Sequence, residues 1–145
     1  MKYVFSAPAL AITLALLSAN AAAAWTPAGD LFDGSGFYDK ASVKRTGPLV
    51  SFNIMVNFKE PDPPRNGRPG AASTIAVIEM DCRQALMRRL SSEGHVGRDG
   101  TGAITKKNDA PAGWRQINLQ NFARRDPMLG LYNQMCPAAK APAPK

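Results

Sequence analysis

The sequence predicts an α+β fold, in which an antiparallel β-sheet carries a C-terminal α-helix tethered to it by a disulfide bond. Three observations lead to this prediction. Residues 49–58 alternate apolar and polar side chains, which is the pattern of a strand with one buried face and one face toward solvent. Residues 73–82 are a second strand-like stretch that ends on Cys82. The only other cysteine, Cys136, follows a short helical pattern.

Residues 1–24 have the features of a secretory signal peptide. Lys2 gives a positive start, residues 4–17 are nearly all apolar, and the alanines at 22–24 are the small residues that a signal peptidase recognises, so cleavage is expected just before Trp25. A membrane anchor is the alternative, but the apolar run is short for a bilayer span. We therefore expect an exported protein, periplasmic or at the cell surface, with no transmembrane span after cleavage.

Export to an oxidising compartment would allow the two cysteines to form a disulfide bond. Two thiols in an oxidising compartment usually pair, so Cys82 and Cys136 are predicted to form a disulfide. The loop-entropy model gives about 4 kcal/mol for a loop of this length. That is a large share of the roughly 5–15 kcal/mol that stabilises a small domain. Two free buried thiols are the alternative.

The 145-residue chain is too short for two ordinary domains. We expect a single domain over residues 25–136. Residues 137–145 alternate alanine, proline and lysine, which predicts a disordered tail.

The start of this domain is expected to be a hairpin. Trp25 is predicted to anchor a first short strand in the core, residues 29–36 form a turn cluster, and residues 37–39 form a second short strand. A polar connection over residues 40–47 then leads to the strand at 49–58.

Aspartates in this region raise the question of a calcium site. Asp30, Asp33 and Asp39 are spaced suggestively, but Leu31 and Phe32 fall where a calcium loop needs oxygen ligands, and no bidentate glutamate follows. Two cysteines and one histidine also fall short of a tetrahedral zinc set. We expect no metal and no cofactor.

Residues 59–70 contain four prolines and two glycines and are expected to form a long loop between the two central strands. Proline removes the donors that a strand ladder needs, so pairing is predicted to stop there. Arg65 and Arg68 make the loop basic.

Later elements are less distinct. Residues 83–90 fit either a strand or a helical turn, and residues 91–102 are turn-rich. Residues 103–107 are predicted to form a short strand, and residues 114–117 a final strand with the indole of Trp114 buried.

The C-terminal helix is predicted from both its start and its apolar face. Asp126 suits the N-cap position, and Pro127 suits the first helical position. Residues at i, i+3, i+4 and i+7 form one apolar stripe, made of Met128, Leu131, Tyr132 and Met135. Because Cys136 adjoins the stripe, the helix should lie on the sheet face that carries Cys82.

Short motifs occur along nearly the whole of residues 25–136. They are Trp25, Phe37-Tyr38-Asp39 followed by Ala41-Ser42-Val43, the strand at 50–58, Glu79-Met80-Asp81-Cys82, Gly100-Thr101-Gly102, Trp114-Arg115-Gln116-Ile117 and the helix that closes on Cys136. In this order they resemble the surface-adhesin protein E-like family of bacterial envelope proteins. The resemblance implies a sheet of about six antiparallel strands with a tethered helix, and an adhesin-like activity. The chain departs from the family in having no lipoprotein cysteine and in its proline-rich loop.

The leading functional hypothesis is a non-enzymatic binding module of the cell envelope. The formal net charge of +7, of which Lys2 contributes one, favours an acidic partner, either a protein of matrix type or an acidic polymer at the envelope or host surface. The working surface is expected to be the sheet face away from the helix together with the loop at 59–70. The candidate binding residues are Arg65, Arg68, Arg88, Arg89, Lys106 and Lys107.

Other functions are weighed against this one. A structural or accessory envelope protein with no soluble ligand is the main alternative, and a basic surface without any partner is also common. Catalysis is disfavoured because the cysteines are expected to be bonded, His95 is alone, and no Gly-x-Ser-x-Gly elbow exists. Specific nucleic-acid binding is disfavoured because aromatic residues do not interleave with the basic ones.

Overall fold

A computed structural model describes residues 24–119 and 126–137. The predicted signal peptide, up to residue 23, and the predicted tail from residue 138 lie outside the described residues. The elements in chain order are β1 (Trp25–Leu31), β2 (Gly34–Asp39), a 3-10 turn (Lys40–Ser42), β3 (Lys44–Thr46), β4 (Leu49–Phe58), β5 (Ser73–Asp81), β6 (Leu86–His95), β7 (Ile104–Asn108), β8 (Arg115–Gln116) and α1 (Leu129–Met135).

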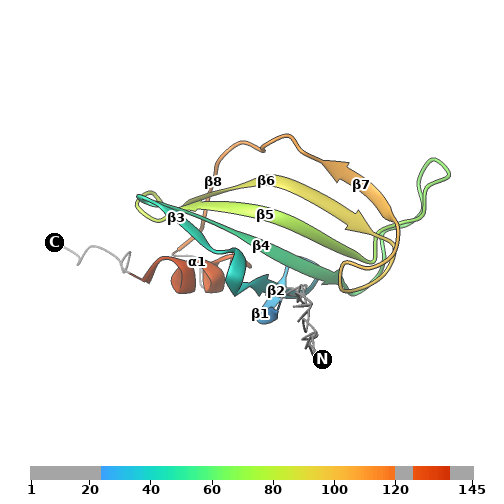
Figure 1. The fold of residues 1–145 in the computed structure, drawn as a ribbon, viewed down its shortest axis with the longest axis horizontal. Coiled ribbons are helices and arrows are strands. Elements are labelled where there is room, and N and C mark those ends of the chain that lie inside the picture. Colours follow the sequence, from blue (N-terminus) through green and yellow to red (C-terminus); the bar gives the residue numbers. More distant parts are fainter. Residues whose placement is uncertain (1–23, 120–125, 138–145) are drawn as a thin grey trace, which may run out of the picture.

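All the strands belong to one antiparallel sheet (Figure 1). The order across it is β1-β2-β4-β5-β6-β7, while β3 pairs with β4 beyond β2, and β8 pairs with β6 beyond β7. The predicted sheet with its tethered C-terminal helix is therefore confirmed. The sheet has eight strands rather than the predicted six or so, because it also contains two very short strands, β3 with three residues and β8 with two.

The centre of the sheet is the pair β4 and β5. Val50 pairs with Met80 and Phe52 with Ile78, so the even-numbered residues of both strands share one face. These side chains are buried in the core together with the apolar residues of α1. We call the side of the sheet that carries them the helix face. The alternation predicted at 49–58 is confirmed.

The opposite side of the sheet, the far face, is less exposed than predicted. Met55 and Asn57 are buried there. Asn57 exchanges two hydrogen bonds with Asp99, because the side-chain amide donates to the carboxylate (2.6 Å) and the Asp99 backbone N–H donates back (2.8 Å). The turn after β6 thus folds over this end of the far face.

The uncertain stretch at 83–90 contains a turn followed by the start of β6. Ala85 closes the turn with a positive φ of 53°, and β6 then runs from Leu86 to His95. The prediction that residues 91–95 belong to a turn is wrong, because each of them pairs with a residue of β5. Cross-strand pairing outweighs the weak local strand preference of this polar segment.

Neither tryptophan is the core anchor that the sequence suggested. Trp25 is half-buried and lies outside the core cluster, and Trp114 is 40% exposed. In the first hairpin the core residue is Leu31, which packs so closely over Gly36 that a Cβ there would lie 2.2 Å from the leucine Cγ. Near β8 the buried residue is Ile117, at 1% exposure.

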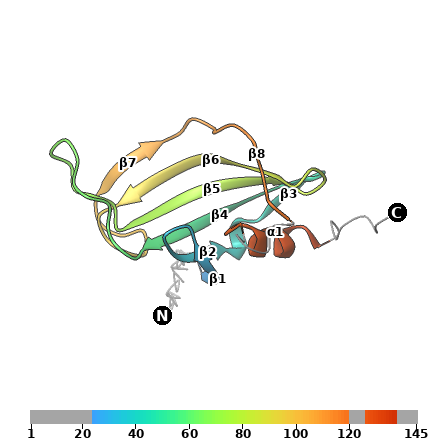
Figure 2. The ribbon, with the colours of Figure 1, turned by 180° about the vertical axis from the view of Figure 1, so that it is seen from behind.

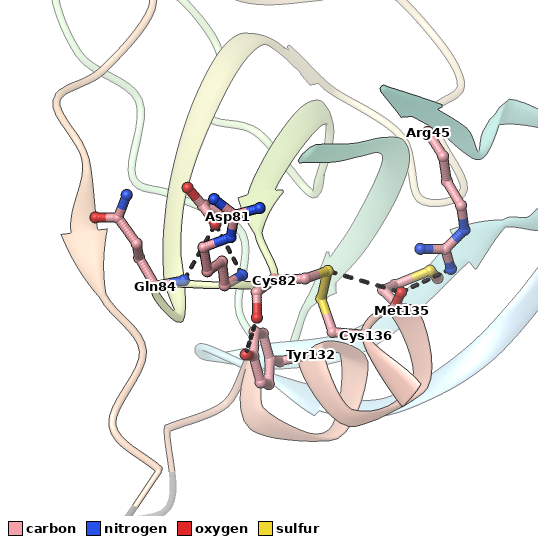
Figure 3. Close-up of a disulfide and its surroundings, with 8 residues drawn as sticks. Arg45, Asp81, Cys82, Gln84, Tyr132, Met135 and Cys136 are labelled. Carbon is pink, nitrogen blue, oxygen red and sulfur yellow. Dashed lines mark hydrogen bonds between the residues drawn. A yellow bond between two sulfur atoms is a disulfide. The ribbon is translucent and has the colours of Figure 1, made fainter. Parts of the chain in front are cut away.

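The helix α1 packs on the helix face at the end of the sheet near β3, and its apolar stripe is buried as predicted (Figures 1 and 2). It begins at Leu129 rather than directly after Asp126, whose carboxylate accepts a hydrogen bond from the Met128 N–H at 2.9 Å. The predicted disulfide is confirmed, since Cys82 and Cys136 are bonded with their Cα atoms 5.3 Å apart (Figure 3).

Candidate functional site

The loop between β4 and β5 projects from the end of the sheet opposite α1 (Figure 1). At its tip, Arg65 and Arg68 exchange two backbone hydrogen bonds of 3.1 and 3.0 Å. The residues between them, Asn66 and Gly67, both have positive φ angles, of 52° and 72°. An Asn-Gly pair of this kind closes a tight two-residue hairpin turn. Residues paired across such a turn lie side by side, so the turn sets the two arginines next to each other.

Close backbone contact holds the two arms of this loop together. The Asp62 N–H donates to the carbonyl of Ala71 at 2.9 Å. Gly70 lies so near the opposite arm that a Cβ on it would be 1.4 Å from the Asp62 carbonyl oxygen. Only glycine fits at this position. The two arginines at the tip are therefore held by two closely packed, hydrogen-bonded arms, which we call the paired stalk of the cleft loop.

A hollow of about 580 Å³ lies between this loop and the edge strand β7. Arg65 and Arg68 line it from the loop, and Lys106 lines it from β7. An adjoining hollow of about 360 Å³ continues along β7 to Lys107. We call the two together the basic cleft, with these four cations as its charged residues. Asp62 is the only acidic residue that lines it within the described part of the chain.

The four cations of the basic cleft differ in their partners. Lys107 lies 3.0 Å from a Glu93 carboxylate oxygen and 3.7 Å from one of Asp109, and the hydrogen bond to Glu93 is the main reason why the pKa of Lys107 is raised. The other three are exposed and form no ion pair among residues 24–119 and 126–137. The free charge of the cleft is thus carried by Arg65, Arg68 and Lys106.

The two remaining candidate residues lie elsewhere. Arg88 is on the far face, where its Nε donates to a Glu79 carboxylate oxygen at 2.6 Å and its guanidinium lies 4.4 Å from the centre of the Trp114 ring. Arg89 lies on the opposite side of β6, because neighbouring residues of a strand point to opposite faces. It pairs with Ile78 in the sheet and lines a groove on the helix face.

That groove was not anticipated from the sequence. It measures about 350 Å³, and its floor is apolar and consists of Ile54, Val56, Ala76, Ile78 and Met87. We call it the apolar groove. It exists because α1, with seven residues, is only about 10 Å long, whereas the ten residues of β4 span about 33 Å. The helix therefore covers only one part of the helix face, and none of its residues lines the groove.

The fold and the cleft together define a class of protein, a small β-sheet scaffold stapled by a disulfide, with a group of exposed cations at the end away from the staple. Comparison with protein families identifies the class more closely. The model of the surface-adhesin protein E family matches residues 25–125, and the chain belongs to this family. The resemblance predicted from the sequence motifs is therefore confirmed.

Solved structures show the same fold. Protein E of Haemophilus influenzae superimposes with a TM-score of 0.56 at 14% identity, over 81% of this chain and 96% of that one. A second crystal form gives a TM-score of 0.55 at 13% identity, over 80% and 97% of the two chains. Protein E from non-typeable Haemophilus influenzae gives 0.51 at 13% identity, over 72% and 69%. A comparison with the curated proteins finds none that matches.

Family membership places the protein among adhesin-like surface proteins, which are exported and act by binding. Within residues 24–119 and 126–137, no helix has the length and apolar character needed to cross a membrane.

Proposed function

We propose that this protein is a non-enzymatic adhesin of the cell surface, and that it binds an acidic partner of matrix type in the basic cleft. The observation that carries the proposal is the grouping of three unpaired cations, Arg65, Arg68 and Lys106, around one hollow. Their charges are left for a partner, because no carboxylate of residues 24–119 and 126–137 neutralises them as Glu79 neutralises Arg88. The proposed binding unit is residues 25–136.

The chemistry of the cleft suits carboxylates and sulfates. A guanidinium presents a planar fork of donors that can hold two oxygens of such a group at once, and two of the three free cations are arginines. The positive net charge, +7 with Lys2 and +6 without it (7 − 1), adds a longer-range attraction that speeds the encounter with an acidic partner. Since these side chains are exposed, binding should weaken as salt screens the charges.

A matched pair of triple variants tests the proposal. The cleft variant carries Arg65→Gln, Arg68→Gln and Lys106→Gln. The control variant carries Lys40→Gln, Lys44→Gln and Arg83→Gln, which changes the net charge equally but lies at exposed positions outside the cleft. Binding to immobilised heparin and to an acidic matrix protein is measured for both variants and for the unaltered protein.

The cleft variant should bind about tenfold more weakly or worse, because several charge-assisted contacts are lost together. The affinity of the control variant should fall by no more than about threefold, which is the part that we assign to the overall positive charge of the protein. Equal losses in both variants would show that charge alone, and not the cleft, attracts the partner. Absence of salt-sensitive binding by the unaltered protein would favour the alternative of a structural envelope protein with no soluble ligand.

A further inference from the structure

We infer that the apolar groove on the helix face is a second binding site, which takes an amphipathic monoanion: a hydrocarbon chain that ends in a single carboxylate. This inference does not depend on the basic cleft. It rests on the shape of the groove, on the apolar character of its floor and on the state of one arginine in its wall.

The groove has the size and lining of a site for a small apolar ligand. Its volume of about 350 Å³ falls at the lower end of the range of roughly 300–1,000 Å³ that is usual for such sites. Phe58 and the half-exposed Phe32, at the turn of the first hairpin, bound it at one side. Ala112 and Gly113 bound it at the other side, where the Ala112 N–H is fixed by the carbonyl of Arg89 at 2.8 Å.

The charges of the groove all have one sign. Its lining contains three arginines and no aspartate or glutamate among the described residues. Two of the arginines are already neutralised from outside the groove, since Arg88 pairs with Glu79, and Arg115 pairs with Asp126 at 2.8 Å. Arg89 has no such partner in the described part of the chain.

The side chain of Arg89 is also left with an unsatisfied donor. Its Nε is buried, and no atom of the described structure accepts a hydrogen bond from it. A buried donor without a partner is costly, and more so on a charged group. A carboxylate bound in the groove would supply the missing negative charge beside the guanidinium. Arg89 therefore distinguishes this groove from an apolar patch that lacks a ligand.

The same observations exclude other ligand classes. A cation would be repelled by the arginines, and a neutral chain would leave the charge of Arg89 without a counter-charge. A sulfated glycan of the kind that fits the basic cleft would have to bury its hydroxyl groups against Ile54 and Val56 without partners. One free guanidinium above an apolar floor matches one carboxylate on one hydrocarbon chain.

The test measures the binding of decanoate, the probe, to the purified protein by isothermal titration calorimetry. Decanoate should bind with a stoichiometry of one, and affinity should fall by roughly fourfold for each methylene removed from the chain. Decyltrimethylammonium and 1-decanol should bind at least about tenfold more weakly, and acetate should not bind. Equal binding of the anionic and cationic chains would overturn the inference, and so would the absence of decanoate binding.

Variants locate the site. Arg89→Met keeps an apolar stem at this position but removes the charge and all donors, and it should weaken decanoate binding by about tenfold, down to the level of 1-decanol. Ala76→Phe should fill the floor of the groove and abolish binding of decanoate while Arg89 is intact. If neither variant changes decanoate binding, the groove is not the site. Should Ala76→Phe fail to fold, Arg89→Met and the chain-length series still decide the question.

The two proposed sites can be separated within the same protein set. The triple variant of the basic cleft should bind decanoate as the unaltered protein does, and Arg89→Met should bind heparin normally. Failure of the heparin experiment leaves the decanoate result standing, because the two sets share no residue.

Discussion

The hydroxyl of Tyr132 in α1 donates a hydrogen bond of 2.9 Å to the backbone carbonyl of Cys82, the residue whose sulfur is bonded to the end of the same helix (Figure 3). A second hydrogen bond holds the last turn of α1, where the Arg45 guanidinium of β3 donates to the carbonyl of Met135 at 2.6 Å. A helix of seven residues is too short to be stable alone. These contacts, the disulfide and the buried apolar stripe therefore hold α1 on the sheet.

The disulfide is expected to contribute the largest single share of this stability. Replacing both Cys82 and Cys136 with alanine should lower the free energy of unfolding by about 4 kcal/mol, because the unfolded chain regains the entropy of an open loop. Urea unfolding of the variant and of the unaltered protein measures the difference. A loss below about 1 kcal/mol would mean that the noncovalent contacts hold the helix by themselves.

The hydrogen bond of Tyr132 should make stability depend on pH at the alkaline end. Burial, and then the nearby charge of Asp81, raise the pKa of Tyr132. A raised pKa means that the neutral phenol favours the folded state, so its contribution is complete below the unfolded pKa of about 10 and is lost as the pH rises through the folded value. Tyr132→Phe should cost about 1 kcal/mol at pH 8. That cost should shrink above about pH 10, as urea unfolding at each pH would show. A cost that is the same at both pH values would contradict the assignment.

The carboxylate of Asp126 should make stability depend on pH at the acid end. Burial alone would raise the pKa of Asp126, but hydrogen bonds from Arg115 and from the Met128 N–H outweigh it, and the pKa is lowered. The contribution of this group is therefore present above the unfolded pKa of about 4 and is lost as the pH falls through the folded value. Asp126→Asn should destabilise the protein at pH 7, and the difference from the unaltered protein should vanish in acid. Asp30→Asn, at an exposed position of β1, is the control and should change stability by less than about 0.5 kcal/mol at either pH.

The stalk of the cleft loop should tolerate no side chain at Gly70. A methyl group there would overlap the Asp62 carbonyl, so Gly70→Ala must push the two arms apart. We expect a loss of more than about 1 kcal/mol in thermal unfolding and weaker heparin binding, because Arg65 and Arg68 shift relative to β7. Gly113→Ala is the matched control, since a Cβ there has no neighbour within 4 Å. Equal melting temperatures for the two variants would contradict the paired-stalk description.

The sequence predicted the elements whose signals are local. The alternation at 49–58, the stripe that includes Leu131 and Tyr132, and the presence of two cysteines in an exported chain each specify one element or bond, and the structure contains all of them. The tight turn at Asn66-Gly67 also has a local signal, because this dipeptide favours a two-residue hairpin. The prolines around it, however, predict only one long loop without strand pairing.

The sites depend on relationships between distant segments, and these could not be predicted. The cleft forms because β7 returns to the edge of the sheet beside the loop, which brings Lys106 to Arg65 and Arg68. Arg88 and Arg89 were grouped with them by charge, yet their opposite directions follow from the strand pairing of β6. The apolar groove depends on the difference in length between α1 and β4, which matters only once the two are packed together.

The decisive measurement is an NMR titration of the isotope-labelled protein with a short heparin oligosaccharide. Binding in the basic cleft predicts that amide shift changes concentrate at residues 62–71 and 104–107, and that about 0.5 M sodium chloride abolishes them. Changes spread evenly over the basic residues, or centred on Arg88 at the far face, would contradict a binding site between the loop and β7.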